Sequence, residues 1–234
     1  MNKHAVALLL GVLSGAAAFF GALLLNPFTA QSGVSPLSFS DNELVTLQYS
    51  AVARESLVYT NDGESQVDPY PPRVLELWEA PVRNTAVRAV VLTGAAERPR
   101  AIGVKFSSDS ETTDLLNGQA DVNSVWHIYL PGRGGLFIQQ AENFWDFLRE
   151  VVAPAYWSAG DSWRGVWTGT ITAGPNALGT ARVFGGSGEL AELQAEAVES
   201  LSAEAYSVEQ GPVALRGELT IELTSANFAV TPDP

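Results

Sequence analysis

The sequence predicts a mainly β protein, a closed antiparallel β-barrel with one packed α-helix, preceded by an N-terminal transmembrane helix. Three observations predict it: an uncharged apolar run over residues 5–25, many short strand patterns separated by glycine and proline turns, and a single segment with helical spacing. Closing the sheet hides its edges, which suits an exported domain that has no cysteine. We assign residues 1–27 to the membrane anchor or signal segment, 28–41 to a linker and 42–231 to the barrel.

The apolar run is long enough to cross a bilayer, which takes about 20 residues of helix. A cleaved secretory signal stays open as the alternative, because Ala16-Ala17-Ala18 offers a small-residue cleavage site and cleavage would secrete the domain. Lys3 precedes the run, and no lysine or arginine follows it before Arg54. The positive-inside rule therefore predicts a cytoplasmic N-terminus and a periplasmic or extracellular domain.

Small residues form a stripe along this helix, at Gly11, Gly15, Ala18 and Ala22. Such a stripe lets two helices approach closely, so it is a candidate packing surface for a second copy or a membrane-complex partner. The alternative is that alanine and glycine are simply common in signal segments.

Composition narrows the classes of partner. The chain has 26 acidic and 13 basic residues, and its net charge is −13. This charge argues against nucleic acid as a partner and disfavours binding to anionic lipid headgroups. The absence of cysteine excludes disulfides and thiol chemistry.

The barrel strands are predicted from short β-branched or alternating runs. The clearest is 215–223, where apolar residues and glycine at odd positions alternate with charged residues and threonine at even positions. The predicted strands are 44–53, 74–78, 87–93, 102–106, 125–130, 136–139, 166–172, 180–184 and 215–223.

The helix is predicted over 142–152, because Phe144, Phe147, Leu148 and Val151 have the spacing of one helical face, and Pro154 is expected to end it. A single helical turn is expected over 114–117. The segment 189–206 has helical composition but also an alternating pattern broken by Glu199. Its neighbours, a strand and a glycine turn, favour a strand.

The C-terminal part, about 163–223, resembles the barrel of allene oxide cyclases and plant dirigent proteins. The resemblance rests on a strand at 166–172, the turn Gly174-Pro175-Asn176, a strand ending in Gly185-Gly186-Ser187-Gly188, an alanine-rich strand and the strand 215–223. Ser187 replaces the family's threonine, and Leu190 stands where an aromatic residue is usual. The resemblance implies a fold, and none of the family's catalytic residues can be matched here.

Chemical motifs are few. His127 is the sole histidine of the predicted barrel, so a zinc or two-histidine iron site is not expected. Gly-x-Ser-x-Gly and phosphate-binding motifs are absent, and Asp109, Glu111 and Asp114 are expected in a solvated loop. We expect no metal and no cofactor.

Aromatic side chains are the remaining signal. The candidate ligand-binding residues are Trp126, His127, Tyr129, Trp163 and Trp167. Trp163 and Trp167 share one strand face if their strand starts early, and the small Gly165 between them then leaves a gap that could admit a flat apolar molecule. The competing interpretation is that these aromatics pack the helix against the barrel.

The predicted function is a membrane-tethered barrel that binds a small hydrophobic ligand or a partner protein. One alternative is an accessory subunit of a membrane complex. A second alternative is a cyclase or isomerase of the kind the resemblance implies, with His127 as its best polar candidate. The sequence does not establish an enzyme.

Overall fold

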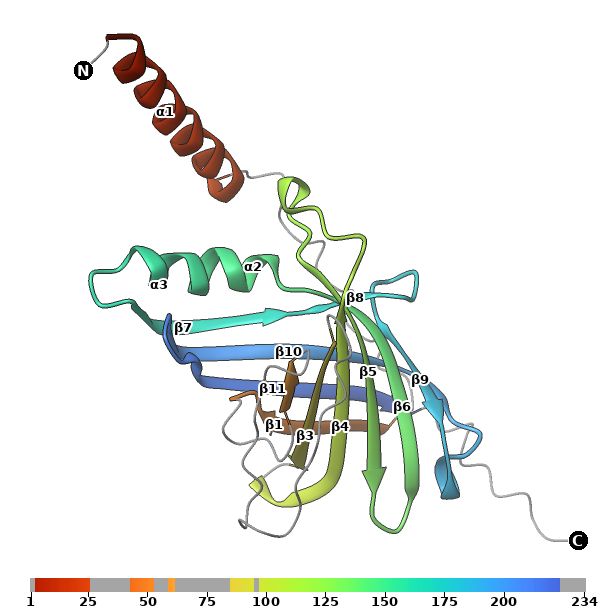
Figure 1. The fold of residues 1–234 in the computed structure, drawn as a ribbon. Coiled ribbons are helices and arrows are strands. Elements are labelled where there is room, and N and C mark those ends of the chain that lie inside the picture. The colour runs from red at the N-terminus through yellow and green to blue at the C-terminus, as the bar shows by residue number, and fades with distance from the viewer. Residues whose placement is uncertain (1–2, 26–42, 53–58, 62–84, 95–96, 224–234) are drawn as a thin grey trace, which may run out of the picture.

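The computed structural model describes residues 3–25, 43–52, 59–61, 85–94 and 97–223. The N-terminal run forms a helix, α1 (Lys3–Leu25), and the rest of the described chain is mainly β (Figure 1). Within these ranges no helix meets the length and apolarity that crossing a membrane requires. The linker 28–41, the strand predicted at 74–78 and the end of the domain beyond 223 lie outside the described residues.

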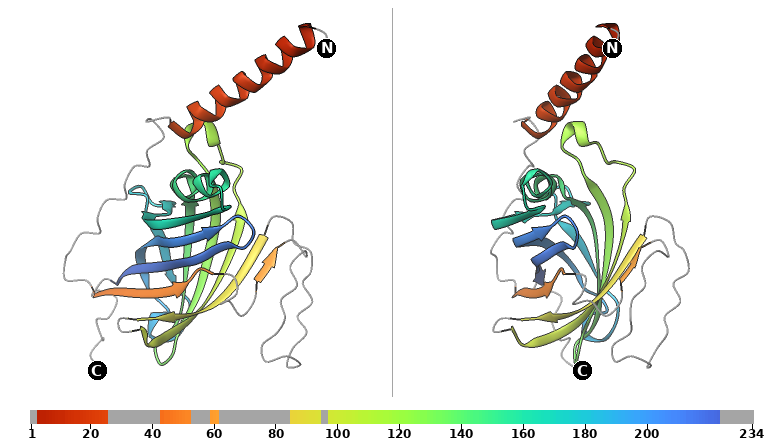
Figure 2. Two further views of the ribbon diagram at one scale, coloured as in Figure 1. Left: turned by 90° about the vertical axis from the view of Figure 1, so that its left-hand side faces the viewer. Right: turned by 60° about the vertical axis from the view of Figure 1, so that its left-hand side comes forward.

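The predicted closed antiparallel barrel is confirmed, and it is built from eight strands. Around the barrel they run β1 (Glu43–Ser50), β11 (Gly211–Leu223), β10 (Gln194–Ser207), β9 (Ala181–Gly185), β6 (Gly134–Asn143), β5 (Asp121–Leu130), β4 (Pro99–Asp109) and β3 (Thr85–Thr93). The pair Gln48–Thr93 joins β1 to β3 and closes the ring. The two views in Figure 2 show the strands curving around a common interior.

Three further strands complete the sheet. β2 (Tyr59–Asn61) pairs with β3, β7 (Ser162–Thr170) pairs with β10, and β8 (Thr172–Gly174) pairs with β6. β9 pairs with residues 194–197 of β10 and 136–139 of β6, whereas β7 pairs with residues 200–207 of β10 and β8 with residues 141–142 of β6. The space between β10 and β6 is therefore bridged by β9 towards one end of the barrel and by β7 and β8 towards the other.

Alternation places one face of each strand in the core. On β11 every odd position from 215 to 223 is buried, which confirms the period-two prediction. The ambiguous segment 189–206 is a short 3₁₀ turn (Gly188–Leu190) followed by β10, so the choice of strand is confirmed for most of its length. The predicted turn before Gly118 is a 3₁₀ turn over Leu115–Asn117.

The helix differs from its prediction at both ends. β6 continues to Asn143, and helical structure starts only at α2 (Trp145–Phe147), so Glu142 belongs to a strand. A π-helical stretch (Leu148–Val152) and α3 (Ala153–Trp157) then carry the helix past Pro154. In the π stretch the N–H of Ala153 bonds the carbonyl of Leu148, and proline is tolerated in the first turn of the α3 segment that follows.

Two glycine turns meet at one end of the barrel. The N–H groups of Gly186 and Ser187 both donate to the carbonyl of Gly135, and the Ser187 hydroxyl accepts from the N–H of Gly135 at 3.0 Å. Gly188 has φ +66°, and a Cβ there would overlap the backbone of Arg133. We call these two hydrogen-bonded turns the glycine clasp, and one of them is the turn that carries the resemblance described above.

Candidate functional site

The barrel holds a cavity of about 390 Å³ at the end opposite the glycine clasp. It lies where β4 ends, β5 begins and β6 leads into α2 (Figure 1). Its lining is partly apolar and partly polar, and we call the polar part around Lys105 and Glu142 the cavity floor. The apolar lining comprises Ala51, Ala86, Val122, Phe144, Phe147, Ile171, Leu201, Pro212 and Leu215, and the polar lining Tyr49, Thr85, Arg88, Lys105, Ser107, Ser108, Asp109 and Glu142.

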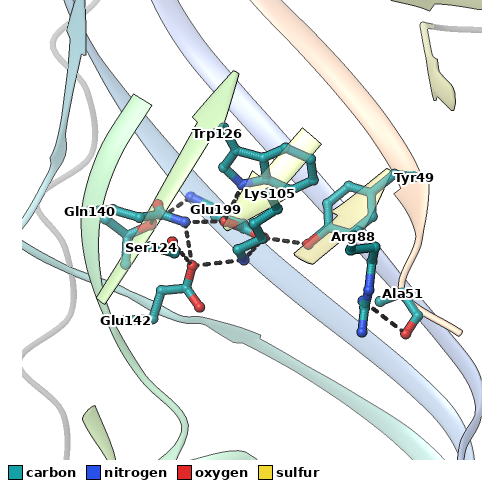
Figure 3. Close-up of polar contacts among 10 residues, drawn as sticks. Tyr49, Ala51, Arg88, Lys105, Ser124, Trp126, Gln140, Glu142 and Glu199 are labelled. Carbon is teal, nitrogen blue, oxygen red and sulfur yellow. Dashed lines mark hydrogen bonds and ion pairs between the residues drawn. The ribbon is translucent and has the colours of Figure 1, made fainter. Parts of the chain in front are cut away.

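The cavity lies on the barrel's weakest seam. β1 and β3 share only the pair Gln48–Thr93, so their backbones do not pair along the cavity wall. There the Arg88 guanidinium on β3 donates to the carbonyl of Ala51 at 3.1 Å (Figure 3). A side chain thus joins the two strands where ladder hydrogen bonds are missing.

Lys105 is the centre of a buried ionic cluster below the cavity (Figure 3). Its ammonium lies 2.7 Å from Oε1 of Glu142 and 2.9 Å from Oε1 of Glu199. It also lies 5.3 Å from the ring centroid of Trp126. The lysine side chain is 10% exposed and the glutamates 1% and 0%, so the charges are shielded from water and act on each other at low dielectric.

Glu199 is fully engaged. Its Oε1 accepts from the Tyr49 hydroxyl and from Lys105, and its Oε2 accepts from Trp126 Nε1 at 3.0 Å and from the Gln140 amide. Four donors on one carboxylate satisfy its acceptor capacity, and this is the condition under which a buried charge is tolerated. Glu199 is therefore the fixed anion of the cluster.

Glu142 is engaged on one oxygen only. Ser124, Gln140 at 2.6 Å and Lys105 all converge on Oε1. Among the described residues no hydrogen bond ends on Oε2, and Glu142 itself lines the cavity. This carboxyl can therefore offer one oxygen to a molecule in the cavity.

Strand register assembles the cluster. Lys105 pairs directly with Trp126 across β4 and β5, and Ser124 pairs with Gln140 across β5 and β6. Glu142 follows Gln140 by two positions, so both point to the same face of β6. Local alternation on three adjacent strands thus places four polar side chains together.

The environment moves the pKa values of the two glutamates in opposite directions. Burial raises the pKa of Glu142 above its ordinary 4.5, and the charge of Glu199 adds to this although Lys105 opposes it. Burial also acts to raise the pKa of Glu199, but Lys105 and the hydrogen bonds from Tyr49 and Trp126 outweigh it and hold the value below 4.5. Two carboxyls with divergent pKa values can hold different protonation states at one pH.

The remaining titrating groups of the cluster stay in their ordinary forms. Burial lowers the pKa of Lys105, but the carboxylates of Glu142 and Glu199 outweigh burial and raise it above 10.5. Burial, followed by the charge of Glu199, raises the pKa of Tyr49 well above 10.0. Near neutral pH the floor thus presents an ammonium and a neutral phenol to the cavity, and the ionised Glu199 lies behind them.

The structure separates the aromatic residues that the sequence groups together. Trp126 is fully buried and faces the interior, whereas His127 and Tyr129 lie on the outer face of β5. The imidazole of His127 stacks on Phe137 with centroids 4.6 Å apart. His127 and Tyr129 therefore do not line the cavity, because neighbouring positions of a strand face opposite ways.

The two later tryptophans, on β7, lie outside the cavity lining. Trp167 is buried against Phe147, with ring centroids 5.2 Å apart. The indole of Trp163 occupies the space beside Gly165, where an added Cβ would meet the ring at 2.7 Å. The predicted gap at Gly165 is therefore filled, and Trp167 packs the helix to the barrel.

Sequence reasoning missed the ionic cluster. Glu199 was noted only as a break in an apolar alternation, and that break is the signal of an inward carboxylate. Lys105 gives the same signal, because it continues the inward positions Ala101 and Gly103 of β4. Glu142 was hidden by its assignment to the helix. Among the described residues no group of three potential ligands could hold a metal ion.

The fold and this cavity define a class: a closed eight-stranded antiparallel barrel with a polar-floored internal cavity. A comparison with protein-family models and a comparison with curated proteins find no match for the chain.

Proposed function

We propose that the barrel binds a small molecule that is mainly apolar and carries one hydrogen-bonding end. The apolar wall around Phe144, Phe147 and Leu201 would surround the body of the ligand. The volume lies within the usual range of ligand sites, about 300–1,000 Å³. Apolar walls with a few convergent polar groups are typical of such sites.

One observation carries the proposal: polar groups on the cavity floor have hydrogen-bonding positions that the buried cluster does not use. Lys105 gives two of its three ammonium donors to glutamates, and Glu142 keeps Oε2 outside the cluster's hydrogen bonds. Both residues line the cavity. A buried donor and acceptor side by side favour a ligand whose polar end can pair with both.

We further propose that the barrel is tethered to a membrane on its non-cytoplasmic side. The uncharged run within α1, with Lys3 before it, supports the tether and its orientation. A membrane is also a source of apolar ligands. Kinship with the allene oxide cyclase and dirigent barrel is part of the same proposal, supported by the eight-stranded closure and the glycine clasp.

A matched pair of variants tests binding. Ala86 lines the cavity, whereas Ala89 lies on the outer face of the same strand, so Ala86→Trp fills the cavity and Ala89→Trp does not. The full chain in mild detergent is titrated with the apolar fluorophore N-phenyl-1-naphthylamine. We expect saturable binding by the wild type and Ala89→Trp and its loss in Ala86→Trp. Equal signals from all three chains would refute the proposal.

A second candidate is a proton-transferring isomerase or cyclase, and the open oxygen of Glu142 favours it. His127, the sequence-based candidate, lies outside the barrel, so Glu142 takes its place as the group able to move a proton within the cavity. The chain with its co-purifying ligand would be incubated in D₂O, and the mass of the ligand would then be measured by mass spectrometry. Deuterium uptake that is lost in Glu142→Gln but kept in the exposed control Glu204→Gln would support this activity, and uptake unchanged in Glu142→Gln would exclude it.

A further inference from the structure

One outer face of the barrel carries large apolar side chains in contact with solvent. They lie on five neighbouring strands, β3, β4, β5, β6 and β9, and each is between 37% and 52% exposed. We call this the apolar outer face. Its exposed members are Val91, Ile102, Phe106, Val125, Tyr129, Phe137 and Phe184.

Strand register makes this face continuous. One row runs from Val91 through Ile102 to Tyr129. The next row runs from Val104 through His127 and Phe137 to Phe184. A third row pairs Phe106 with Val125. Directly paired side chains on one face touch each other, so the rows form a single patch rather than scattered residues.

Within the part of the chain that the structure describes, the rows of this face carry no acidic side chain, although the chain has a net charge of −13. The polar side chains in these rows are His127 and, where the third row continues past Val125, Gln139 and Arg182. The outward positions of β10 and β11 are acidic by contrast, with Glu196, Glu204 and Glu218. Among the described strand positions, outward carboxylates therefore lie on the side of the barrel opposite the apolar outer face.

We propose that the apolar outer face is an interface between two copies of this chain. Two strongly acidic molecules repel each other, and they can meet at low electrostatic cost only through a face without carboxylates. A basic partner would need acidic groups here, and an anionic lipid surface would need a cluster of cations. A face-to-face pair keeps both acidic sides outermost.

The size of the face sets the strength of the pair. Five strands about 4.8 Å apart and three rows about 6.8 Å apart enclose at most roughly 500 Å² on each copy. About 1,000 Å² in total is at the lower limit for a specific interface. The pair is therefore a reversible dimer whose population depends on concentration.

Cross-linking tests the geometry directly, because the chain has no cysteine of its own. Val125→Cys places one thiol on the apolar outer face, and Thr220→Cys places one on the outward side of β11. The full chain in mild detergent is treated with a short bismaleimide. We expect a covalent dimer from Val125→Cys and little from Thr220→Cys. Equal cross-linking of both, or of neither, would overturn the proposal, as would cross-linking in native membranes of Val125→Cys to a different protein alone.

A second measurement separates this face from contacts between α1 helices. Sedimentation equilibrium is run in a Gly11→Leu/Gly15→Leu background, which blocks close packing of that helix. Phe137→Glu should convert the dimer to monomer, whereas the matched charge Thr220→Glu should not. Ile102→Lys gives the same test if the circular dichroism of Phe137→Glu shows misfolding. A chain that stays monomeric before either substitution contradicts the interface.

Discussion

Tyr49 on β1 pairs directly with Gly217 on β11, and the tyrosine ring lies over the glycine so closely that a Cβ at 217 would overlap it. This position of the ring brings the Tyr49 hydroxyl to Oε1 of Glu199. It also sets the ring edge-to-face with Trp126, with centroids 5.0 Å apart. Gly217 therefore leaves room for the Tyr49 ring, which packs against Trp126, and both of these side chains donate hydrogen bonds to the buried Glu199 carboxylate.

Replacing this glycine tests the relationship. Gly217→Ala should displace the Tyr49 ring and lower the free energy of unfolding by about 2–3 kcal/mol, the usual cost of overpacking with a lost hydrogen bond. Urea denaturation of the full chain measures it. In a Gly217→Ala background, Tyr49→Ala should cost less than it does in the wild type. Additive costs would show that the two residues do not interact.

Removing the central cation should be more damaging. Lys105→Met leaves Glu142 and Glu199 together without a countercharge, and breaking a buried ion pair in this way costs about 3–5 kcal/mol. The exposed control Arg216→Met should change unfolding by less than about 1 kcal/mol. Adding Glu142→Gln to Lys105→Met should recover part of the loss. A loss no larger than that of Arg216→Met would contradict a charged cluster.

The raised pKa of Glu142 has a defined sign in stability. Its folded value lies above the unfolded 4.5, so the folded chain binds this proton more tightly. The stabilisation is complete below the unfolded pKa and is lost as pH rises through the folded pKa. The free energy of unfolding of wild type minus that of Glu142→Gln should therefore fall as pH rises above 4.5. A flat difference would contradict the shift.

Glu199 should show the opposite slope. Its folded pKa lies below 4.5, so its contribution is present above the unfolded pKa and is lost as pH falls through the folded pKa. The advantage of the wild type over Glu199→Gln should shrink as the pH is lowered from about 5 to about 3. If both glutamine variants gave the same slope, the two carboxyls would share one environment.

The outward aromatics give a negative prediction for binding. His127→Ala and Tyr129→Ala should leave binding of N-phenyl-1-naphthylamine unchanged, because both side chains lie on the outer face. Leu201→Trp, which fills the cavity from β10, should reduce binding at least tenfold. Fluorescence titration compares the three variants. A loss of binding in His127→Ala would instead place the binding site on the outer face of the barrel.

The sequence predicted the barrel well because half-buried strands leave a period-two pattern that needs no knowledge of their partners. β11 shows this most clearly, since each predicted inward residue is buried. The predicted helix starts too early because its first two residues precede the apolar stripe that begins at Phe144, and β6 instead continues to Asn143 in pairing with β5.

The ionic cluster could not be predicted from the sequence, because its members lie far apart along the chain and come together only when the sheet closes. Glu199, Lys105 and Tyr49 come from three strands whose adjacency depends on register and strand order. Each is inconspicuous alone, a single polar residue at an inward position. His127 attracted notice as a rare residue type, but rarity carries no information about the face of a strand.

Native mass spectrometry of the full chain released from its own membranes tests the central claim, ligand binding in the cavity, most directly. We predict a bound small molecule on the wild type and on Ala89→Trp, and its absence from Ala86→Trp. A wild-type chain that carries no added mass, or an Ala86→Trp chain that carries the same mass, would contradict it.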